Sequence, residues 1–185
     1  MCTHLCPSHL PPQTTNKANE TSASMLEKAR LKNHETLLVI AGTSGVGSMA
    51  IQLGKARGCR VIATGSTKEK RNKILQWGAD EAIDPHEGDW WKRVKALTGG
   101  QGADVVFENV GEATWSQSLL ALARGGRLTT CGATTGSLVE RRGRGVLMGS
   151  KLTGLIGCVP VEKIVASRVN VWRRHGFRTN DTILS

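Results

Sequence analysis

The sequence predicts an α/β fold in which a doubly wound, six-stranded parallel sheet carries helices on both faces. The first observation is an alternation of short apolar runs with segments whose apolar residues recur every three or four positions. The second is a glycine-rich turn, Gly42-Thr43-Ser44-Gly45-Val46-Gly47, between one such run and one such segment. In a sheet of this kind the crossovers are right-handed, and ligands bind at the carboxyl ends of the strands.

The alternation starts with a short helix, expected from Met25 to about Lys32, and the apolar run Thr36–Ala41. Because this run is nearly continuous, we expect a strand that is buried on both faces. The helix after the turn ends at Gly58 and carries one apolar stripe, formed by Val46, Met49, Ala50 and Leu53. A second strand is expected over Arg60–Thr64.

The remaining elements repeat this pattern. The later strands are short apolar runs, most of them bounded by Gly or Pro, at 81–84, 103–108, 127–131 and 151–156. The later helices show helical spacing of apolar residues, at 68–77, 89–97, 112–123 and 160–176. In the helix at 112–123 the expected apolar stripe consists of Trp115, Leu119 and Leu122.

Composition and charge divide the chain into three parts. Residues 1–20 are polar, contain Pro and lack periodicity, so we expect a flexible leader before a domain over 21–178 and a tail over 179–185. The net charge is +10, and residues 137–185 hold nine Lys or Arg against three acidic residues. A basic region can attract nucleic acid, but Arg141, Arg142 and Arg144 have no aromatic residues between them for base stacking. Nucleic-acid binding is therefore a less favoured alternative to a solvated surface.

Other residue types exclude several classes of protein. The chain has five Cys, an odd number that does not suggest a disulfide framework, so we expect a reducing, cytoplasmic location. No apolar run approaches the roughly 18 residues of a membrane span. Cys2, His4, Cys6 and His9 match no zinc-ligand spacing, and we expect no metal site. The chain has no Tyr, which excludes every mechanism that uses a tyrosine acid or base.

The glycine-rich turn is the candidate binding site. A pyrophosphate needs donors, and the first turn of a helix offers unpaired backbone N–H groups and the positive end of the helix dipole. Small residues let the phosphates approach, and Gly42, Ser44, Gly45 and Gly47 meet this need. Ser44 replaces the middle Gly of a strict G-x-G-x-x-G, and a turn without a ligand is the alternative. The order strand, turn, helix, strand favours a Rossmann-type dinucleotide site.

The end of the second strand bears on which dinucleotide binds. A domain that prefers NAD usually places Asp or Glu there to bind the ribose hydroxyls, whereas this chain has Thr64-Gly65-Ser66-Thr67-Lys68. Hydroxyls and cations suit a 2′-phosphate, and Ser66, Lys70 and Arg71 could supply them. Ser66 or Thr67 could instead cap the next helix. We therefore expect NADP, with NAD as the alternative.

Four segments and the entry to the first strand resemble the cofactor domain of the medium-chain dehydrogenase/reductase superfamily, in its quinone oxidoreductase-like and zinc-binding alcohol dehydrogenase branch. The segments are AGTSGVGSMAIQLGKARGCRVIAT, LQWGADEAID, LTGGQGADVVFENVG and ARGGRLTTCGATTG, and the entry is MLEKARLKNHETLLVIAG. Together they place about residues 21–136 in the order of the family. The stretch at 151–176 fits the family more loosely, and 137–150 departs from it.

This resemblance implies roles for particular residues. Gly45, Val46 and Gly47 would meet the pyrophosphate, and Ser66 and Lys70 would face the phosphate of the adenosine ribose. Asn109, Val110 and Gly111 would lie along the cofactor. Gly132 and Ala133 would approach its nicotinamide end beside Cys131, which we interpret as a buried thiol without a catalytic role.

The resemblance also implies a limit to the function. The family places a GroES-like catalytic domain before the cofactor domain, and we expect that domain to be absent, which would leave the chain catalytically incomplete alone. A non-catalytic dinucleotide-binding or regulatory module is the alternative. We further expect apolar surface near Ser24–Leu31 and Val146–Leu155, which a second copy or a partner chain would cover.

Overall fold

The computed structural model describes residues 15–132, 134–135 and 157–160 of the 185-residue chain. The helices are α1 (Thr15–Lys28), α2 (Gly45–Ala56), α3 (Lys68–Gln76), α4 (Trp90–Leu97) and α5 (Glu112–Leu120). The strands are β1 (Thr36–Val39), β2 (Arg60–Thr64), β3 (Glu81–Ile83), β4 (Ala103–Glu108), β5 (Leu122–Thr130) and β6 (Gly157–Pro160). The start of the leader, the expected helix after Pro160 and most of the basic region lie outside these residues.

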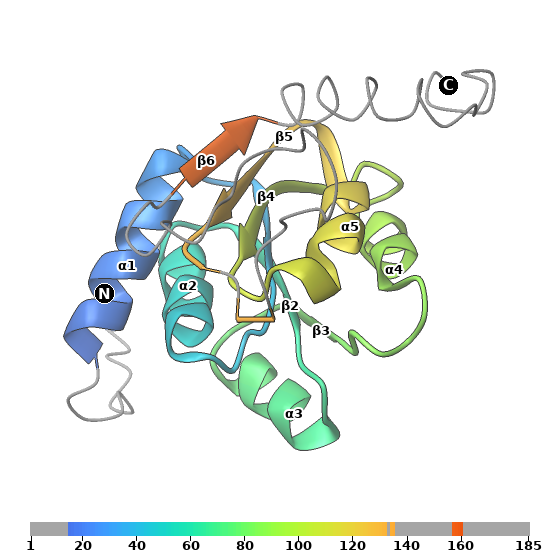
Figure 1. Cartoon of the computed structure of the whole chain (residues 1–185), viewed down its shortest axis with the longest axis horizontal. Coiled ribbons are helices and arrows are strands. Elements are labelled where there is room, and N and C mark those ends of the chain that lie inside the picture. The colour runs from blue at the N-terminus through green and yellow to red at the C-terminus, as the bar shows by residue number, and fades with distance from the viewer. Residues whose placement is uncertain (1–14, 133, 136–156, 161–185) are drawn as a thin grey trace, which may run out of the picture.

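The sheet has the order β3-β2-β1-β4-β5-β6, and β1 to β5 run parallel (Figure 1). The α/β fold class with a parallel, doubly wound sheet is thereby confirmed. The expectation of a sixth parallel strand is wrong, because β6 pairs antiparallel with β5, with Thr130 opposite Gly157. The expected strand at 151–156 lies outside the described residues. Alternation along a sequence does not determine the direction of an edge strand, and an antiparallel edge on a parallel sheet is common.

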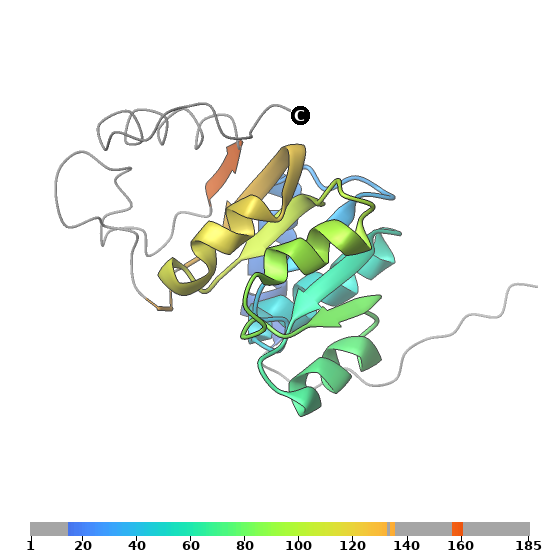
Figure 2. The same cartoon turned by 90° about the vertical axis from the view of Figure 1, so that its right-hand side faces the viewer.

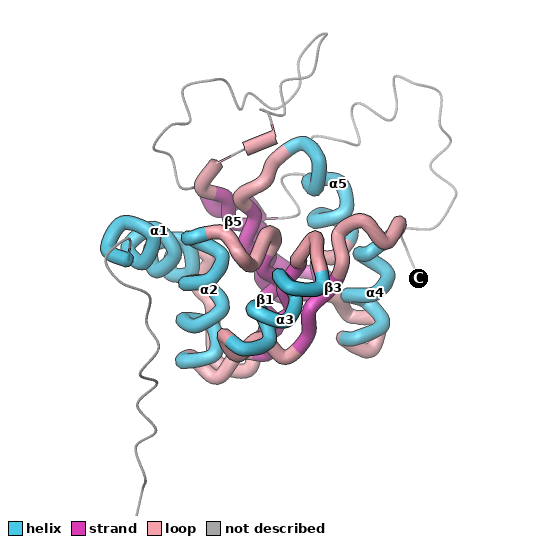
Figure 3. The backbone as a smooth tube through the Cα atoms, turned by 90° about the horizontal axis from the view of Figure 1, so that it is seen from below, coloured by secondary structure: helices cyan, strands magenta, loops and turns pink. Residues whose placement is uncertain are grey.

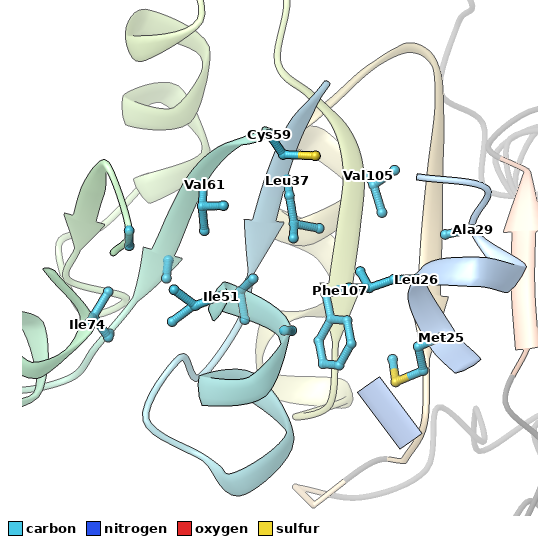
Figure 4. Packing of buried hydrophobic residues seen from close by; sticks show 14 residues of the cluster. Met25, Leu26, Ala29, Leu37, Ile51, Cys59, Val61, Ile74, Val105 and Phe107 are labelled. Carbon is cyan, nitrogen blue, oxygen red and sulfur yellow. The ribbon is translucent and has the colours of Figure 1, made fainter. Parts of the chain in front are cut away.

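The two faces of the sheet are covered by different helices, as expected from the alternation of side chains along each strand. Leu37 and Val39 of β1 belong to one buried cluster, which also takes residues from α1, α2 and α3. Leu38 and Ile40 belong to the opposite cluster, which takes residues from α4 and α5. Figures 2 and 3 show α1 and α2 on one side of the strands and α4 and α5 on the other. Figure 4 shows the first cluster around Phe107.

Helix α1 begins earlier than its sequence indicates. It starts at Thr15, so the residues from Thr15 to Glu20, which we assigned to the polar leader, are helical. A helix needs apolar residues only where it faces the core, and the first turns of α1 expose Lys17 and Glu20 to solvent. A polar, exposed turn carries no apolar period, which explains why the pattern did not reveal it.

The same helix corrects the expected apolar surface near Ser24–Leu31. Met25, Leu26 and Ala29 are fully buried against the sheet, so they do not form an exposed patch. The other expected stretch, Val146–Leu155, lies outside the described residues, and association with a partner chain stays a prediction. No helix in the described part of the chain is long and apolar enough to cross a bilayer.

Helix α5 and strand β5 meet earlier than expected. The helix ends at Leu120, and Leu122, which we expected on the helical stripe, is the first residue of β5. Gly125 and Gly126 lie inside the strand rather than before it, and Gly125 has a φ of 74°. The pairing of β4 with β5 shifts register between Ala103 and Val105. The glycines therefore accompany an irregularity in the strand instead of separating it from the helix.

Candidate functional site

The glycine-rich turn leads from β1 into the first turn of α2. Ser44 is the N-cap of this helix, and its Oγ accepts a hydrogen bond from the Gly47 N–H at 3.0 Å. Among the described residues, no group accepts a hydrogen bond from the backbone N–H of Gly45 or Val46. These N–H groups and the positive end of the helix dipole make the turn a site for an anion.

The space available for a side chain differs among the glycine positions of the turn. A Cβ on Gly47 would lie 2.5 Å from the Ala41 carbonyl oxygen, and one on Gly42 would lie 3.0 Å from Cβ of Ala63. The folded chain itself therefore leaves no room at Gly47 and little at Gly42. Gly45 differs, because it is exposed and a Cβ there would meet only the Ala18 side chain, at 3.9 Å. Packing therefore does not require glycine at position 45.

A second loop joins this turn at the point where the order of the sheet reverses. Strands β1 and β4 are neighbours, and the loops that follow them lie on either side of this switch point. Nδ2 of Asn109, which follows β4, donates a hydrogen bond to Ser44 Oγ at 2.7 Å. Asn109 is only 8% exposed, and its Oδ1 is buried without a hydrogen-bond partner among the described residues. An unpaired buried acceptor is costly, so this oxygen is suited to receive a ligand hydroxyl.

Glu108 holds the loop after β4, and the sequence analysis assigned it no role. Its Oε1 accepts hydrogen bonds from the N–H groups of Val110, at 2.8 Å, and Gly111, at 3.2 Å. Gly111 has a φ of 96°, which glycine adopts readily, and it is the N-cap of α5. An acidic residue directly after the apolar run Val105-Val106-Phe107 was the available signal for this role.

The loop after β5 packs against the loop after β4. The N–H and the hydroxyl of Thr135 both donate to the Val110 carbonyl, at 2.9 and 2.8 Å. Gly132 is exposed next to this contact, and Ala133 lies outside the described residues. Burial raises the pKa of the Cys131 thiol, and the Glu108 carboxylate raises it further. A thiol with a raised pKa is a poor nucleophile at neutral pH. Cys131 is only half-buried, however, which differs from the buried thiol that we expected, and its lack of a catalytic role stays a prediction.

The end of β2 is tied directly to the glycine-rich turn. The Thr64 hydroxyl accepts a hydrogen bond from the Ala41 N–H, and the Thr64 carbonyl accepts one from Gly42, each at 2.9 Å. Beyond β2, Lys70 Nζ donates to Ser66 Oγ at 3.2 Å, so the structure brings this predicted pair together. The cap of α3 is Thr67, whose hydroxyl accepts from the Lys70 N–H at 3.3 Å. Ser66 is therefore not needed as the cap.

Arg71, the third candidate at this end of β2, is already paired. Its Nη1 lies 2.6 Å from Asp84 Oδ2 and 2.9 Å from the Gly65 carbonyl oxygen. The hydrogen bond from the His86 N–H and the nearby Arg71 guanidinium hold the pKa of Asp84 below its usual value, although desolvation opposes this shift. The aspartate consequently stays ionised and neutralises much of the arginine charge at neutral pH.

The described residues contain no cluster of three His, Cys, Asp or Glu side chains that could hold a metal ion. The Cys and His residues of the leader lie outside this part of the chain. What the site does offer is polar: helix N–H donors, one orphan amide oxygen, and a hydroxyl with an adjacent, positively charged ammonium group. Donors and acceptors of this kind fit the phosphates and ribose hydroxyls of a dinucleotide.

Comparisons with known proteins agree on one family. A family described as zinc-binding dehydrogenase matches residues 45–174. Quinone oxidoreductase 1 of Escherichia coli (strain K12) is 37% identical over 108 residues, which cover 58% of this chain and 33% of the relative. Crotonyl-CoA reductase of Streptomyces collinus is 31% identical over 140 residues, which cover 66% of this chain and 31% of the relative.

A similar solved structure is that of a mycobacterial protein described as complexed with NADPH. It has a TM-score of 0.66 and 34% sequence identity, and the match covers 73% of this chain and 43% of the mycobacterial chain. The chain thus spans about a third of the length of the curated relatives named above (33% and 31%).

Proposed function

The chain belongs to the zinc-binding dehydrogenase family of the medium-chain dehydrogenase/reductase superfamily, and we propose on that premise that its glycine-rich turn binds a nicotinamide dinucleotide. Two observations at the switch point together carry this proposal. Among the described residues, the N–H groups of Gly45 and Val46 have no acceptor, and Oδ1 of Asn109 has no donor. Both features are unsatisfied within the described chain, and a dinucleotide has the groups that would satisfy both.

Each part of the site has a separate task in this proposal. The Gly45 and Val46 N–H groups donate to the pyrophosphate, and the absence of side chains at Gly45 and Gly47 keeps the approach open. Asn109 Oδ1 accepts a hydrogen bond from a ribose hydroxyl. Val110, Gly111 and Gly132 line the path toward the nicotinamide. When bound in its reduced form, the nicotinamide ring supplies a hydride.

We further propose NADP(H) rather than NAD(H) as the preferred cofactor. Ser66 Oγ and Lys70 Nζ lie 3.2 Å apart after β2, where a hydroxyl and an ammonium group can bind a 2′-phosphate. The mycobacterial relative described as complexed with NADPH supports this preference. The residue at the end of β2 is Thr64, whose hydroxyl is used by Ala41, so no carboxylate there favours NAD.

For the whole protein we propose an oxidoreductase that uses the bound hydride donor, with a quinone as the first substrate to test. The name quinone oxidoreductase, borne by the Escherichia coli relative, supports this choice. In this proposal the described residues orient the cofactor, and no residue is assigned to the substrate. A non-catalytic dinucleotide-binding module is the second candidate, and it requires the same cofactor site without turnover.

One experiment separates these candidates. The chain is titrated with NADPH and with NADH while nucleotide fluorescence is recorded, and NADPH consumption is then followed with a simple quinone. We expect saturable binding of both nucleotides, with NADPH bound more tightly. Failure of both nucleotides to bind would contradict the cofactor site. Quinone reduction well above the background rate would favour the enzyme over the module, and it would show that our expectation of an incomplete chain is wrong.

A further inference from the structure

Glu108 is a buried carboxylate that has no cationic partner among the residues that the structure describes. It is the last residue of β4 and is 0% exposed. The ion pairs of the described residues join other groups: Lys55–Asp80, Arg71–Asp84, Lys92–Asp89 and Arg127–Glu35. Burial of an unpaired charge is expensive, and a well-packed apolar residue is often no worse for stability. The position therefore calls for an explanation beyond the packing of the sheet.

The carboxylate is satisfied entirely by hydrogen-bond donors from the segment that follows it. Oε1 accepts from the N–H groups of Val110 and Gly111. Thr114 Oγ1 lies 3.1 Å from both carboxylate oxygens, and Ser118 Oγ donates to Oε2 at 2.5 Å. Because Thr114 and Ser118 are one helical turn apart, they hold the carboxylate against α5 from one side. The other side of the same carboxylate fixes the backbone of the loop.

We propose that Glu108 is a positioning residue for the cofactor site, which fixes the loop of Asn109, Val110 and Gly111 so that the Asn109 amide meets Ser44 at the switch point. This inference rests on the proposed function, because it assigns Glu108 a role in cofactor affinity. Glu108 reaches the site only through the loop backbone. The adjacent residue, Asn109, carries the contact to Ser44 Oγ at 2.7 Å.

The same carboxylate also fixes the loop after β5. The Val110 carbonyl accepts both hydrogen bonds of Thr135, so a Val110 backbone held by Glu108 provides a rigid platform for that loop. Loss of the carboxylate would therefore loosen two of the loops at the carboxyl edge of the sheet. The β-sheet and the opposite cluster beneath α4 should stay in place, because Glu108 pairs with β5 through its backbone and the cluster consists of apolar side chains.

Variants at position 108 separate acceptor geometry from simple packing. Glu108→Leu has a similar size and removes both acceptors. Glu108→Gln keeps one oxygen for the Val110 and Gly111 N–H groups, and its amide NH2 can donate to the hydroxyls of Thr114 and Ser118 once these rotate. Val94→Ala is the matched control. Val94 is fully buried in the opposite cluster, so its truncation should lower stability without removing a hydrogen bond from the loop.

The test is a titration of each variant of the full chain with NADPH, beside its thermal unfolding. We expect NADPH affinity to fall at least about tenfold in Glu108→Leu, which equals the roughly 1.4 kcal/mol of one lost hydrogen-bonded anchor. Glu108→Gln should stay within about threefold of the wild type. Val94→Ala should bind like the wild type although its Tm is lower.

Three results would overturn the inference. Glu108→Leu could bind NADPH with wild-type affinity, Glu108→Leu and Val94→Ala could lose NADPH affinity equally, or Glu108→Gln could bind NADPH as weakly as Glu108→Leu. Should Glu108→Leu fail to fold, the double variant Thr114→Val, Ser118→Ala replaces it, since it removes the α5 side of the clamp. An NADPH affinity between about threefold and tenfold weaker than that of the wild type is then expected, and unchanged affinity overturns the inference. Failure of the wild type itself to bind NADPH would instead contradict the proposed function.

Discussion

Asn109 Nδ2 donates a hydrogen bond to Ser44 Oγ at 2.7 Å, and this contact joins the loops that follow β4 and β1. Ser44 Oγ also accepts from the Gly47 N–H, so a single hydroxyl links the cap of α2 to the neighbouring loop. The two sides of the switch point are thus connected by the protein alone. A site organised before the ligand arrives loses less entropy on binding.

Asn109→Leu should separate binding from stability. The substitution removes the donor to Ser44, but it also removes the buried Oδ1, which has no partner among the described residues. These effects oppose each other, so we expect the free energy of unfolding to change by no more than about 1 kcal/mol. NADPH affinity should fall about tenfold or more, because the acceptor for a ribose hydroxyl is lost. Urea unfolding and nucleotide titration of the same sample measure both, and unchanged affinity would exclude Asn109 from the site.

Lys70→Ala should change the cofactor preference rather than cofactor binding in general. Under the proposal Lys70 Nζ, beside Ser66 Oγ, contacts only the 2′-phosphate, which NADH lacks. We expect NADPH affinity to fall about tenfold while NADH affinity is unchanged, as for one charge-assisted contact. Lys73→Ala is the control. Lys73 is exposed on the same helix, and its substitution also removes one positive charge. If both substitutions lowered NADPH affinity equally, Lys70 would act only by long-range attraction of the nucleotide's negative charge and would not contact the 2′-phosphate.

Asp84→Asn should strengthen NADPH binding. Asp84 Oδ2 lies 2.6 Å from Arg71 Nη1, so the aspartate neutralises a cation one residue from Lys70. Without that charge the potential near Ser66 becomes more positive, and we expect about threefold higher NADPH affinity at low salt with little change for NADH. Asp89→Asn serves as the control, because Asp89 pairs with Lys92 on the exposed surface of α4. Weaker NADPH binding in Asp84→Asn would mean that the pair matters for the shape of the loop.

Asp80 should make stability depend on pH. Burial tends to raise its pKa, but hydrogen bonds from Lys55 and the Val61 N–H outweigh burial and hold the pKa below its usual value. A lowered folded-state pKa stabilises the protein above the unfolded value of about 4, and this contribution is lost as the pH falls through the folded value.

The corresponding variant is Asp80→Asn. The Asp80 side chain is 39% exposed, so the loss should be limited to about 1 kcal/mol at pH 7 and should be smaller at pH 3, below the unfolded pKa of about 4. Urea unfolding at the two pH values measures this difference. Glu87→Gln, at an exposed position in the loop before α4, is the control for the loss of one negative charge. A loss that is equal at pH 7 and pH 3 would contradict the role of the ionised carboxylate.

The elements that the sequence predicted well are those in which one local pattern decides the structure. The segment Ala103–Glu108 is a strand with the expected bounds, because its apolar centre, Val105-Val106-Phe107, is typical of a strand buried on both faces. The turn before α2 was predicted because small residues between a strand and a helix are typical of a turn that lets a phosphate approach the helix N–H groups. The start of α1 was missed, because exposed helical turns carry no apolar period, and the direction of β6 was missed, because it depends on pairing far along the chain.

The same division applies to the candidate site. Ser66 and Lys70 could be paired from the sequence, because they are one helical turn apart. The contact between Asn109 and Ser44 spans 65 positions, and only the order of the strands brings these residues together. From the sequence, Glu108 was only the polar residue at the end of a strand. No local pattern indicates that four groups from the following segment donate hydrogen bonds to its carboxylate.

Gly45 offers the most direct test of the central claim, that the glycine-rich turn binds the pyrophosphate of a nicotinamide dinucleotide. Gly45→Asp should fold like the wild type, because a Cβ there meets only Ala18 at 3.9 Å and an acid suits the first turn of a helix. Gly47→Asp, in contrast, should lower the Tm, because its Cβ would lie 2.5 Å from the Ala41 carbonyl oxygen.

The deciding measurement is the calorimetric titration of wild type and Gly45→Asp with NADPH, after unfolding curves have shown equal stability. The wild type should bind saturably, and Gly45→Asp should lose at least about 100-fold in affinity, since its carboxylate would stand where the pyrophosphate charge is bound. Equal affinity of the two proteins, or no binding of NADPH by the wild type, would contradict the account.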